Sequence, residues 1–203
     1  MSTQKINDIV HGFTKLIPYI SFCIAVSTVS GLFYAISLAL SLKIFSNNKY
    51  LFLFSTCIGL VATCIIIPYV IFKYIKGDKD YSIKSCKKLL IRLLIEELLI
   101  FIFCRIINIE LEIVIFYMFI GICEEYLFRV KILGYLEKYM KQGTAWVLTS
   151  LLFALIFHAN CSFISNILVR FPLAIIFTLI RKKVGYSEAC VTHSLYNIII
   201  GLI

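Results

Sequence analysis

Two long runs of this 203-residue chain carry no charged side chain, residues 16–42 and residues 50–72. A transmembrane helix needs about 20 predominantly apolar residues, and each run is long enough to form one. The whole composition agrees, because 61% of the residues are hydrophobic and 15% are charged, whereas about 25% are charged in a typical soluble domain. The chain is therefore predicted to be an all-α, polytopic integral membrane protein with no large soluble domain.

The same criterion, applied along the chain, gives about seven spans in a single integral membrane domain, residues 1–203. The expected spans are residues 17–42, 50–72, 89–107, a stretch that starts at 113 and runs into GICEEYLFR (121–129), 144–162, 164–180 and 186–203.

The basic residues predict an orientation for these spans. Lys and Arg number two in the N-terminal segment, six in residues 73–88, four in residues 129–141 and three in residues 181–183. The alternate connections hold two, one and none. Cytoplasmic loops collect Lys and Arg, so the pattern predicts a multi-pass protein of the cell membrane with the N-terminus inside and the C-terminus outside.

Several classes of protein are not expected. The net charge of +9 follows from this topology, and no basic face with aromatic residues indicates nucleic-acid binding. The eight cysteines show no CxxC and no pairing rhythm, so they are interpreted as small buried hydrophobic residues rather than a disulfide framework. The N-terminal residues 1–15 carry charges and no cleavage site of small residues, so no cleavable signal peptide is expected.

Polar side chains are concentrated in the second half of the chain. An ionisable residue inside a bilayer costs a few kcal/mol, and such residues usually face a protein interior or a wet cavity. The residues concerned are Glu124, Glu125, Arg129, His158, Arg170, Glu188, His193 and Asn197.

Glu125 and Arg129 are four residues apart, which on a helix places them on one face within reach of an ion pair. A structural ion pair is one interpretation. Glu124 points about 100° away from Glu125, so Arg129 does not neutralise both carboxylates equally. The less neutralised Glu124 is then suited to act as a general base.

His158 and the pair His193 and Asn197 supply further polar groups. If the helix of Glu124 turns near residue 141, Glu124 and His158 lie at similar distances from the turn of a helical hairpin, at similar depth. His193 and Asn197 share one helix face. As a donor pair they could hold an oxyanion, or they could simply join two helices by hydrogen bonds.

Together these groups fit the activation of water for attack on an amide. They also fit a metal site, because Glu124, His158 and His193 make a plausible catalytic zinc set. The HExxH motif that commonly places such ligands on a helix is absent from the sequence. No cofactor is certain, and a divalent metal such as zinc stays open.

The order of these motifs resembles the CPBP family of CAAX proteases and bacteriocin-processing enzymes, also called the Abi family. Its pattern is EExxxR, then FxxxH, then HxxxN or HxxxD on successive membrane helices. Glu124 to Arg129 match the first motif and His193 to Asn197 match the third. The second motif departs, because Phe153 lies five residues before His158 and Ala154 occupies the position four residues before it.

The resemblance implies an intramembrane endopeptidase of the glutamate type, with residues 113–203 as its catalytic core and residues 1–110 as variable N-terminal helices. It implies that Glu124 and His158 activate water, that Glu125 and Arg129 support the site, and that His193 and Asn197 form an oxyanion hole. The substrate would be a peptide or lipidated peptide. Bacterial relatives are linked to bacteriocin self-immunity, peptide maturation and signalling-peptide processing, and the modest length resembles those bacterial members.

Other functions remain open at this point. A non-enzymatic immunity or partner-binding membrane protein could use the same scaffold, and the charged cluster of the third expected span favours it: Arg92, Glu96, Glu97 and Arg105. Arg92 and Glu96 are spaced for a structural ion pair.

Two further alternatives rest on single features. Buried ionisable groups also mark ion paths, which would suit a transporter or channel, although no inverted repeat is detectable. A cysteine protease could use Cys123 or Cys190, but the carboxylate of Glu124 beside Cys123 would disfavour a thiolate there.

Overall fold

A computed structural model describes residues 3–76 and 86–202, and within these ranges the chain forms helices and no strands. Short π-helical segments, labelled η, interrupt several of the helices. The elements are α1 (Thr3–Phe45), α2 (Lys49–Val61), η1 (Ala62–Ile66), α3 (Ile67–Lys76), α4 (Cys86–Ile106), α5 (Leu111–Glu125), η3 (Tyr126–Ile132), α6 (Leu133–Leu136), α7 (Gln142–Leu151), η4 (Leu152–Phe157), α8 (Phe163–Ser165), η5 (Asn166–Arg170), α9 (Phe171–Lys183) and α10 (Tyr186–Gly201).

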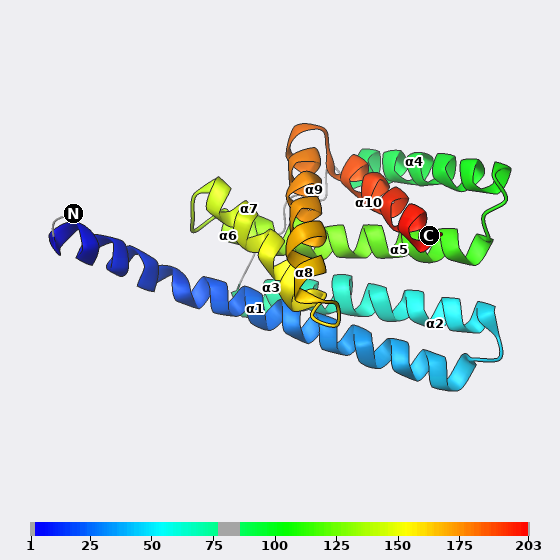
Figure 1. The fold of residues 1–203 in the computed structure, drawn as a ribbon, viewed down its shortest axis with the longest axis horizontal. Helices are drawn as coiled ribbons and strands as arrows, with labels where there is room; N and C mark the ends of the chain where they lie inside the picture. Colours follow the sequence, from blue (N-terminus) through cyan, green and yellow to red (C-terminus); the bar gives the residue numbers. More distant parts are fainter. Residues whose placement is uncertain (1–2, 77–85, 203) are drawn as a thin grey trace.

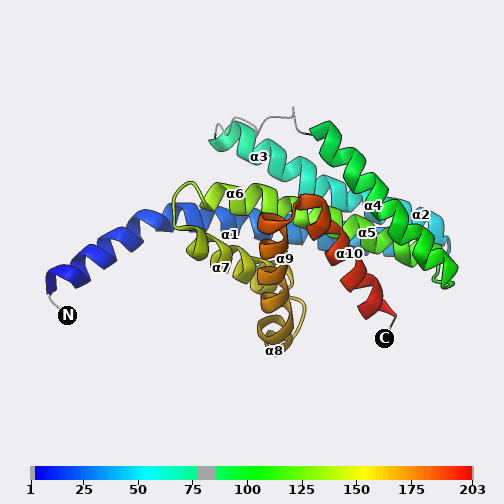
Figure 2. The ribbon, with the colours of Figure 1, turned by 90° about the horizontal axis from the view of Figure 1, so that it is seen from above.

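The helices pack side by side around α5. Figure 1 shows α1 running along the molecule, with its N-terminal end projecting beyond the other helices. Helix α2 returns antiparallel to α1 and also packs against α5, while α4 and α10 pack against one another and against α5. Figure 2 shows α9 crossing close to α7 and α10. Helix α5 is thus placed where several other helices can contribute side chains to its C-terminal end.

The interior is apolar, and so are the outward faces. One buried cluster joins residues of α1, η1, η3, α6 and η4, and a second joins α4, α5 and α10. On the outside, Leu32, Phe33 and Ile36 of α1 and Leu94 and Leu99 of α4 are all more than half exposed. Large apolar side chains on an outer face are expected where helices contact lipid tails.

By length and composition, three helical stretches of the described residues can cross a membrane: Thr14–Phe45, Lys49–Tyr74 and Phe163–Lys183. Gln142–Phe157 is a shorter apolar helix. Helix α4 carries more charged residues, and α10 has 16 residues. A membrane protein is therefore supported, while the count of seven spans and the N-in orientation stay predictions.

Three details of the predicted spans need correction. The fifth helix ends at Phe157, and residues 158–162 form a turn instead of completing a span. The connection predicted at 73–88 is shorter, because α3 extends to Lys76 and α4 begins at Cys86; residues 77–85 lie outside the described part. Arg129 lies within η3 and is 1% exposed, so it does not belong among the loop charges.

Candidate active site

Two adjacent carboxylates end helix α5 in the centre of the helical assembly. Glu124 is 3% exposed and Glu125 is fully buried. The chain continues without a break into η3, so the backbone on both sides of the two carboxylates is held by helical hydrogen bonds. Burying two ionised carboxylates is unfavourable unless partners surround them, and the neighbouring residues show which partners each has.

Arg129 pairs with Glu125 and not with Glu124. Its Nε lies 3.3 Å from Oε2 of Glu125. The geometry does not meet hydrogen-bond criteria, so this contact is an ion pair held by charge. A guanidinium nitrogen, Nη2, donates to the carbonyl oxygen of Ala174 in α9 at 3.2 Å. The predicted i, i+4 pair of Glu125 and Arg129 is confirmed.

Glu124 instead faces two histidines. Its Oε2 lies 3.7 Å from Nε2 of His158 and 3.6 Å from Nε2 of His193. Among the described residues this oxygen has no hydrogen-bond partner. The predicted proximity of Glu124 and His158 across a helical hairpin is confirmed. Polar contacts of this length are often bridged by a water molecule.

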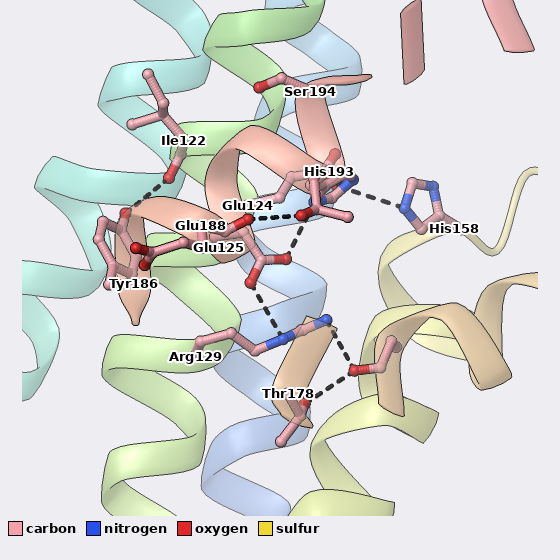
Figure 3. A network of polar contacts seen from close by, with 12 residues as sticks. Ile122, Glu124, Glu125, Arg129, His158, Thr178, Tyr186, Glu188, His193 and Ser194 are labelled. Atoms are coloured by element: carbon pink, nitrogen blue, oxygen red, sulfur yellow. Dashed lines mark hydrogen bonds and ion pairs between the residues drawn. The ribbon is translucent and has the colours of Figure 1, made fainter. Parts of the chain in front are cut away.

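The other ring nitrogen of His193, Nδ1, contacts Glu125. It lies 3.0 Å from Oε1 of Glu125. An ionised carboxylate can only accept a hydrogen bond, so Nδ1 carries the proton that it donates to Glu125. The ring also stacks on Phe177 of α9, with centroids 4.6 Å apart. Figure 3 shows Glu124, Glu125 and His193 facing one another, Arg129 next to Glu125, and His158 reaching toward them from another segment.

Other predicted polar residues lie outside this group. Asn197 is half-buried on α10, and no hydrogen bond of its side chain occurs within the described part of the chain. Glu188 forms an ion pair with Arg92 of α4. The guanidinium of Arg170 donates to the hydroxyl of Ser165 at 2.9 Å. The structure therefore brings together five of the six predicted site residues and does not connect Asn197 to them.

Phe153 and His158 are joined by a π-helical turn. In a π-helix residues five apart, rather than four apart, follow each other along the axis. The backbone N–H of His158 donates to the carbonyl of Phe153, five residues earlier, at 3.3 Å. The two rings lie 4.7 Å apart at their centroids, and the Phe153 ring also lies 5.2 Å from the guanidinium carbon of Arg129. Segment η4 thus accommodates the extra residue that separates Phe153 from His158.

A metal ion was the other possibility for the two histidines. Within residues 3–76 and 86–202, no group of three or more His, Cys, Asp and Glu side chains is arranged to hold a metal ion.

Three residues behind His193 were not anticipated as part of the site. Ser194 donates from its hydroxyl to Oε1 of Glu97 in α4 at 3.1 Å. On its other side lies Gly121 of α5, where an added Cβ would come within 3.0 Å of the Ser194 nitrogen. In the sequence Glu97 is an unexpected charge in a predicted span, but its partner is 97 residues away and no local pattern indicates the pairing.

Residues 107–199 match the family model described as Rce1-like, type II CAAX prenyl endopeptidase. This part of the chain is similar to that family. The match confirms the resemblance to CAAX proteases drawn from the motifs, and it includes every candidate site residue from Glu124 to Asn197. Helices α1 to α4 precede it.

No curated protein matches the chain, and no solved structure matches it either. The comparison therefore rests on the family model, which indicates a membrane peptidase in general terms.

Proposed function

We propose that the protein is an intramembrane endopeptidase that hydrolyses a peptide or lipidated-peptide substrate with water activated by Glu124 and His158. The observation that carries the proposal is the buried Glu124 carboxylate, whose Oε2 lies within 3.7 Å of two imidazole nitrogens and has no hydrogen-bond partner among the described residues. The Rce1-like match supports the same class of reaction.

Glu124 is the general base of the proposed reaction. A water molecule shared by Glu124 and His158 gives a proton to the carboxylate, and its oxygen forms a bond to the carbonyl carbon of the substrate. The carbonyl π-electrons move to the oxygen and give a tetrahedral oxyanion. Collapse of this intermediate breaks the C–N bond, and the proton held by Glu124 passes to the leaving nitrogen. General acid–base catalysis of this kind contributes about 10²- to 10⁴-fold in rate.

Glu125 and Arg129 position the reacting groups. Glu125 holds Nδ1 of His193 at 3.0 Å, and Arg129 balances the charge of Glu125. In the proposed oxyanion hole, His193 donates from Nε2, which requires a proton on both ring nitrogens. Asn197 lies one turn further along α10 and would reach the oxyanion in the substrate complex. Removing one such donor typically costs about 10²- to 10³-fold in kcat.

The biological setting is part of the proposal. We place the protein in a bacterial cell membrane as a multi-pass enzyme, N-terminus inside. Its role would lie in bacteriocin or signalling-peptide processing or in self-immunity.

A non-enzymatic immunity or partner-binding protein is the second candidate. The polar contacts between α4 and α10 favour it, because Arg92 bonds to Glu96 at 2.8 Å and pairs with Glu188 outside the matched active-site motifs. In that case protection of the cell would persist in the Glu124→Gln variant and would depend on α4.

Two other candidates have weaker support. A cysteine nucleophile at Cys123 would need access to substrate, yet the residue is 1% exposed. The Cys123→Ala variant is expected to keep its activity. A transporter would show uptake in liposomes that disappears with Glu125→Gln.

The experiment compares cells that carry the natural protein with cells that carry Glu124→Gln at matched membrane levels. Peptides and membrane proteins of both are identified by mass spectrometry. The proposal expects a precursor to accumulate and its trimmed product to disappear in the variant.

A matched control is Glu110→Gln, the same change at the exposed residue that precedes α5. It should give the natural pattern. Identical profiles for the natural protein and Glu124→Gln, with the natural phenotype retained, would refute the peptidase.

A further inference from the structure

Glu97 is an unusual residue for the outer helix α4. Several of its neighbours, such as Leu94 and Leu98, are more than half exposed, whereas Glu97 is 3% exposed. Its Oε1 accepts a hydrogen bond from Ser194 at 3.1 Å, and its Oε2 has no hydrogen-bond partner among the described residues. A buried carboxylate in a membrane helix is costly, and such residues usually have a function.

Arg92, the nearest arginine along α4, is paired with other carboxylates and not with Glu97. Arg92 bonds to Oε1 of Glu96 at 2.8 Å and pairs with Glu188 of α10. Glu188 lies more than one turn before Ser194 along α10. Glu97 therefore makes a separate contact, and its described partner is the hydroxyl of Ser194.

Ser194 lies where three helices meet. Helix α4 contacts it through Glu97 on one side, and α5 contacts it through Gly121 on the other. A Cβ at Gly121 would lie 3.0 Å from the Ser194 nitrogen and 3.1 Å from the Cys190 carbonyl oxygen, so the two backbones are in close contact. Helix α10 is thus fixed against rotation at this level.

Rotation of α10 would directly disturb His193, which precedes Ser194. A side-chain tip lies about 5–6 Å from the helix axis, so a turn of about 20° would move the imidazole by about 2 Å. That movement exceeds what the 3.0 Å contact between Nδ1 of His193 and Oε1 of Glu125 can tolerate.

We propose that Glu97 is a positioning residue, which holds Ser194 and thereby keeps His193 bonded to Glu125. Helix α4 is then part of the working site, although Glu97 precedes the residues that match the family. The inference deepens the proposed peptidase, since the catalytic consequence of a displaced His193 rests on that function. The structural consequence, a displaced His193 that no longer bonds to Glu125, does not rest on the proposed function.

A double-mutant cycle in the purified protein tests the proposal without a substrate. The melting temperature is measured in detergent for the natural protein, Glu97→Ala, His193→Ala and the double variant. Loss of one hydrogen bond lowers Tm by about 3 °C in a chain of this size. We expect His193→Ala to lower Tm by about that amount alone, and by half or less when Glu97 is already replaced.

Controls separate positioning from simple joining of helices. Glu97→Gln keeps an acceptor for Ser194 and should preserve the full effect of His193→Ala. Glu96→Ala is the same change at the neighbouring residue and should leave that effect unchanged as well. If Glu97→Ala does not accumulate, Ser194→Ala removes the same hydrogen bond and replaces it in the cycle. Equal Tm losses from His193→Ala in both backgrounds would overturn the proposal.

Activity provides the second readout. On the precursor that depends on Glu124, Glu97→Ala should lower kcat about 10- to 100-fold, as expected for a misplaced group, with KM unchanged and with recovery in Glu97→Gln. An unchanged kcat would also overturn the proposal. If the natural protein cleaves nothing, the proposed peptidase fails, and the Tm cycle still decides the role of Glu97.

Discussion

Arg129 balances the charge of a fully buried carboxylate. It is 1% exposed and lies 3.3 Å from Glu125. Removing one partner of a buried ion pair leaves an uncompensated charge, which typically costs about 3–5 kcal/mol. We therefore expect Arg129→Gln to lower the free energy of unfolding by about that amount, measured by unfolding in detergent.

The matched control is Arg105→Gln, at an exposed arginine of α4, which should change stability by less than about 0.5 kcal/mol. Adding Glu125→Gln to Arg129→Gln should recover more than half of the loss, because the uncompensated charge is gone. Equal losses at Arg129 and Arg105 would show that the ion pair does not stabilise the fold.

Contacts within one helix or one hairpin could be predicted from the sequence. The pair Glu125 and Arg129 followed from the spacing, and the approach of Glu124 to His158 followed from counting residues to a turn. The bond between Glu125 and His193 joins residues 68 apart, and nothing local specifies it. For that reason the sequence assigned His193 a role with Asn197 and did not reveal its bond to Glu125.

At the scale of elements, the π-helical segment η4 determines how His158 meets the site. It adds one residue to the turn between Phe153 and His158 while keeping their rings 4.7 Å apart. Because a π-turn can be regarded as one residue inserted into an α-helix, deleting a small residue of η4 should restore an α-turn. Spacing alone showed a departure from the motif, since it assumed a regular α-helix.

Deletion of Ala154 tests this interpretation. We expect the deletion to retain the fold and a measurable part of the cleavage activity, because the α-helical turn keeps both rings on one side. Deletion of Val147, an exposed residue in the α-helical part of α7, should instead rotate the preceding residues by about 100° and abolish folding. Membrane level and melting temperature give the comparison, and equal damage from both deletions would contradict it.

The contact between α5 and α10 depends on a missing side chain at Gly121. A Cβ there would approach backbone atoms of α10 at 3.0 and 3.1 Å, so Gly121→Ala should separate the helices. Overpacking of this kind costs about 1–3 kcal/mol, and activity should fall with it. Gly143→Ala is the control, since a Cβ at Gly143 meets nothing within 4 Å; it should be neutral or slightly stabilising. Thermal unfolding of both variants provides the test, and similar losses would contradict the close contact.

At the scale of the whole molecule, the helices follow the apolar runs that predicted them. Most ends of the expected spans lie within about three residues of the ends of a helix. There are three exceptions: α1 starts earlier, the fifth helix ends at Phe157, and the helix of Glu124 continues to Leu136. Apolar runs specify helices well, because a backbone in lipid must satisfy its own hydrogen bonds. How the helices pack could not be predicted, since lipid-facing and interior residues are similarly apolar.

The orientation is the prediction that belongs to this scale. Basic residues in alternate connections predict an internal N-terminus and an external C-terminus. A fusion of alkaline phosphatase to the C-terminus should be active, and the same enzyme fused in the segment between α9 and α10 should be inactive. The reverse pattern would show that the charge asymmetry does not set the topology.

The central claim is that Glu124 activates water to cut a peptide bond. The most direct measurement places the purified natural protein, or Glu124→Gln, in lipid vesicles with membrane peptides extracted from cells that carry the variant, in water enriched in ¹⁸O. Mass spectrometry then searches for new carboxyl termini that contain ¹⁸O. The account predicts such termini with the natural protein and none with Glu124→Gln. No new termini with the natural protein, or equal labelling with both proteins, would contradict it.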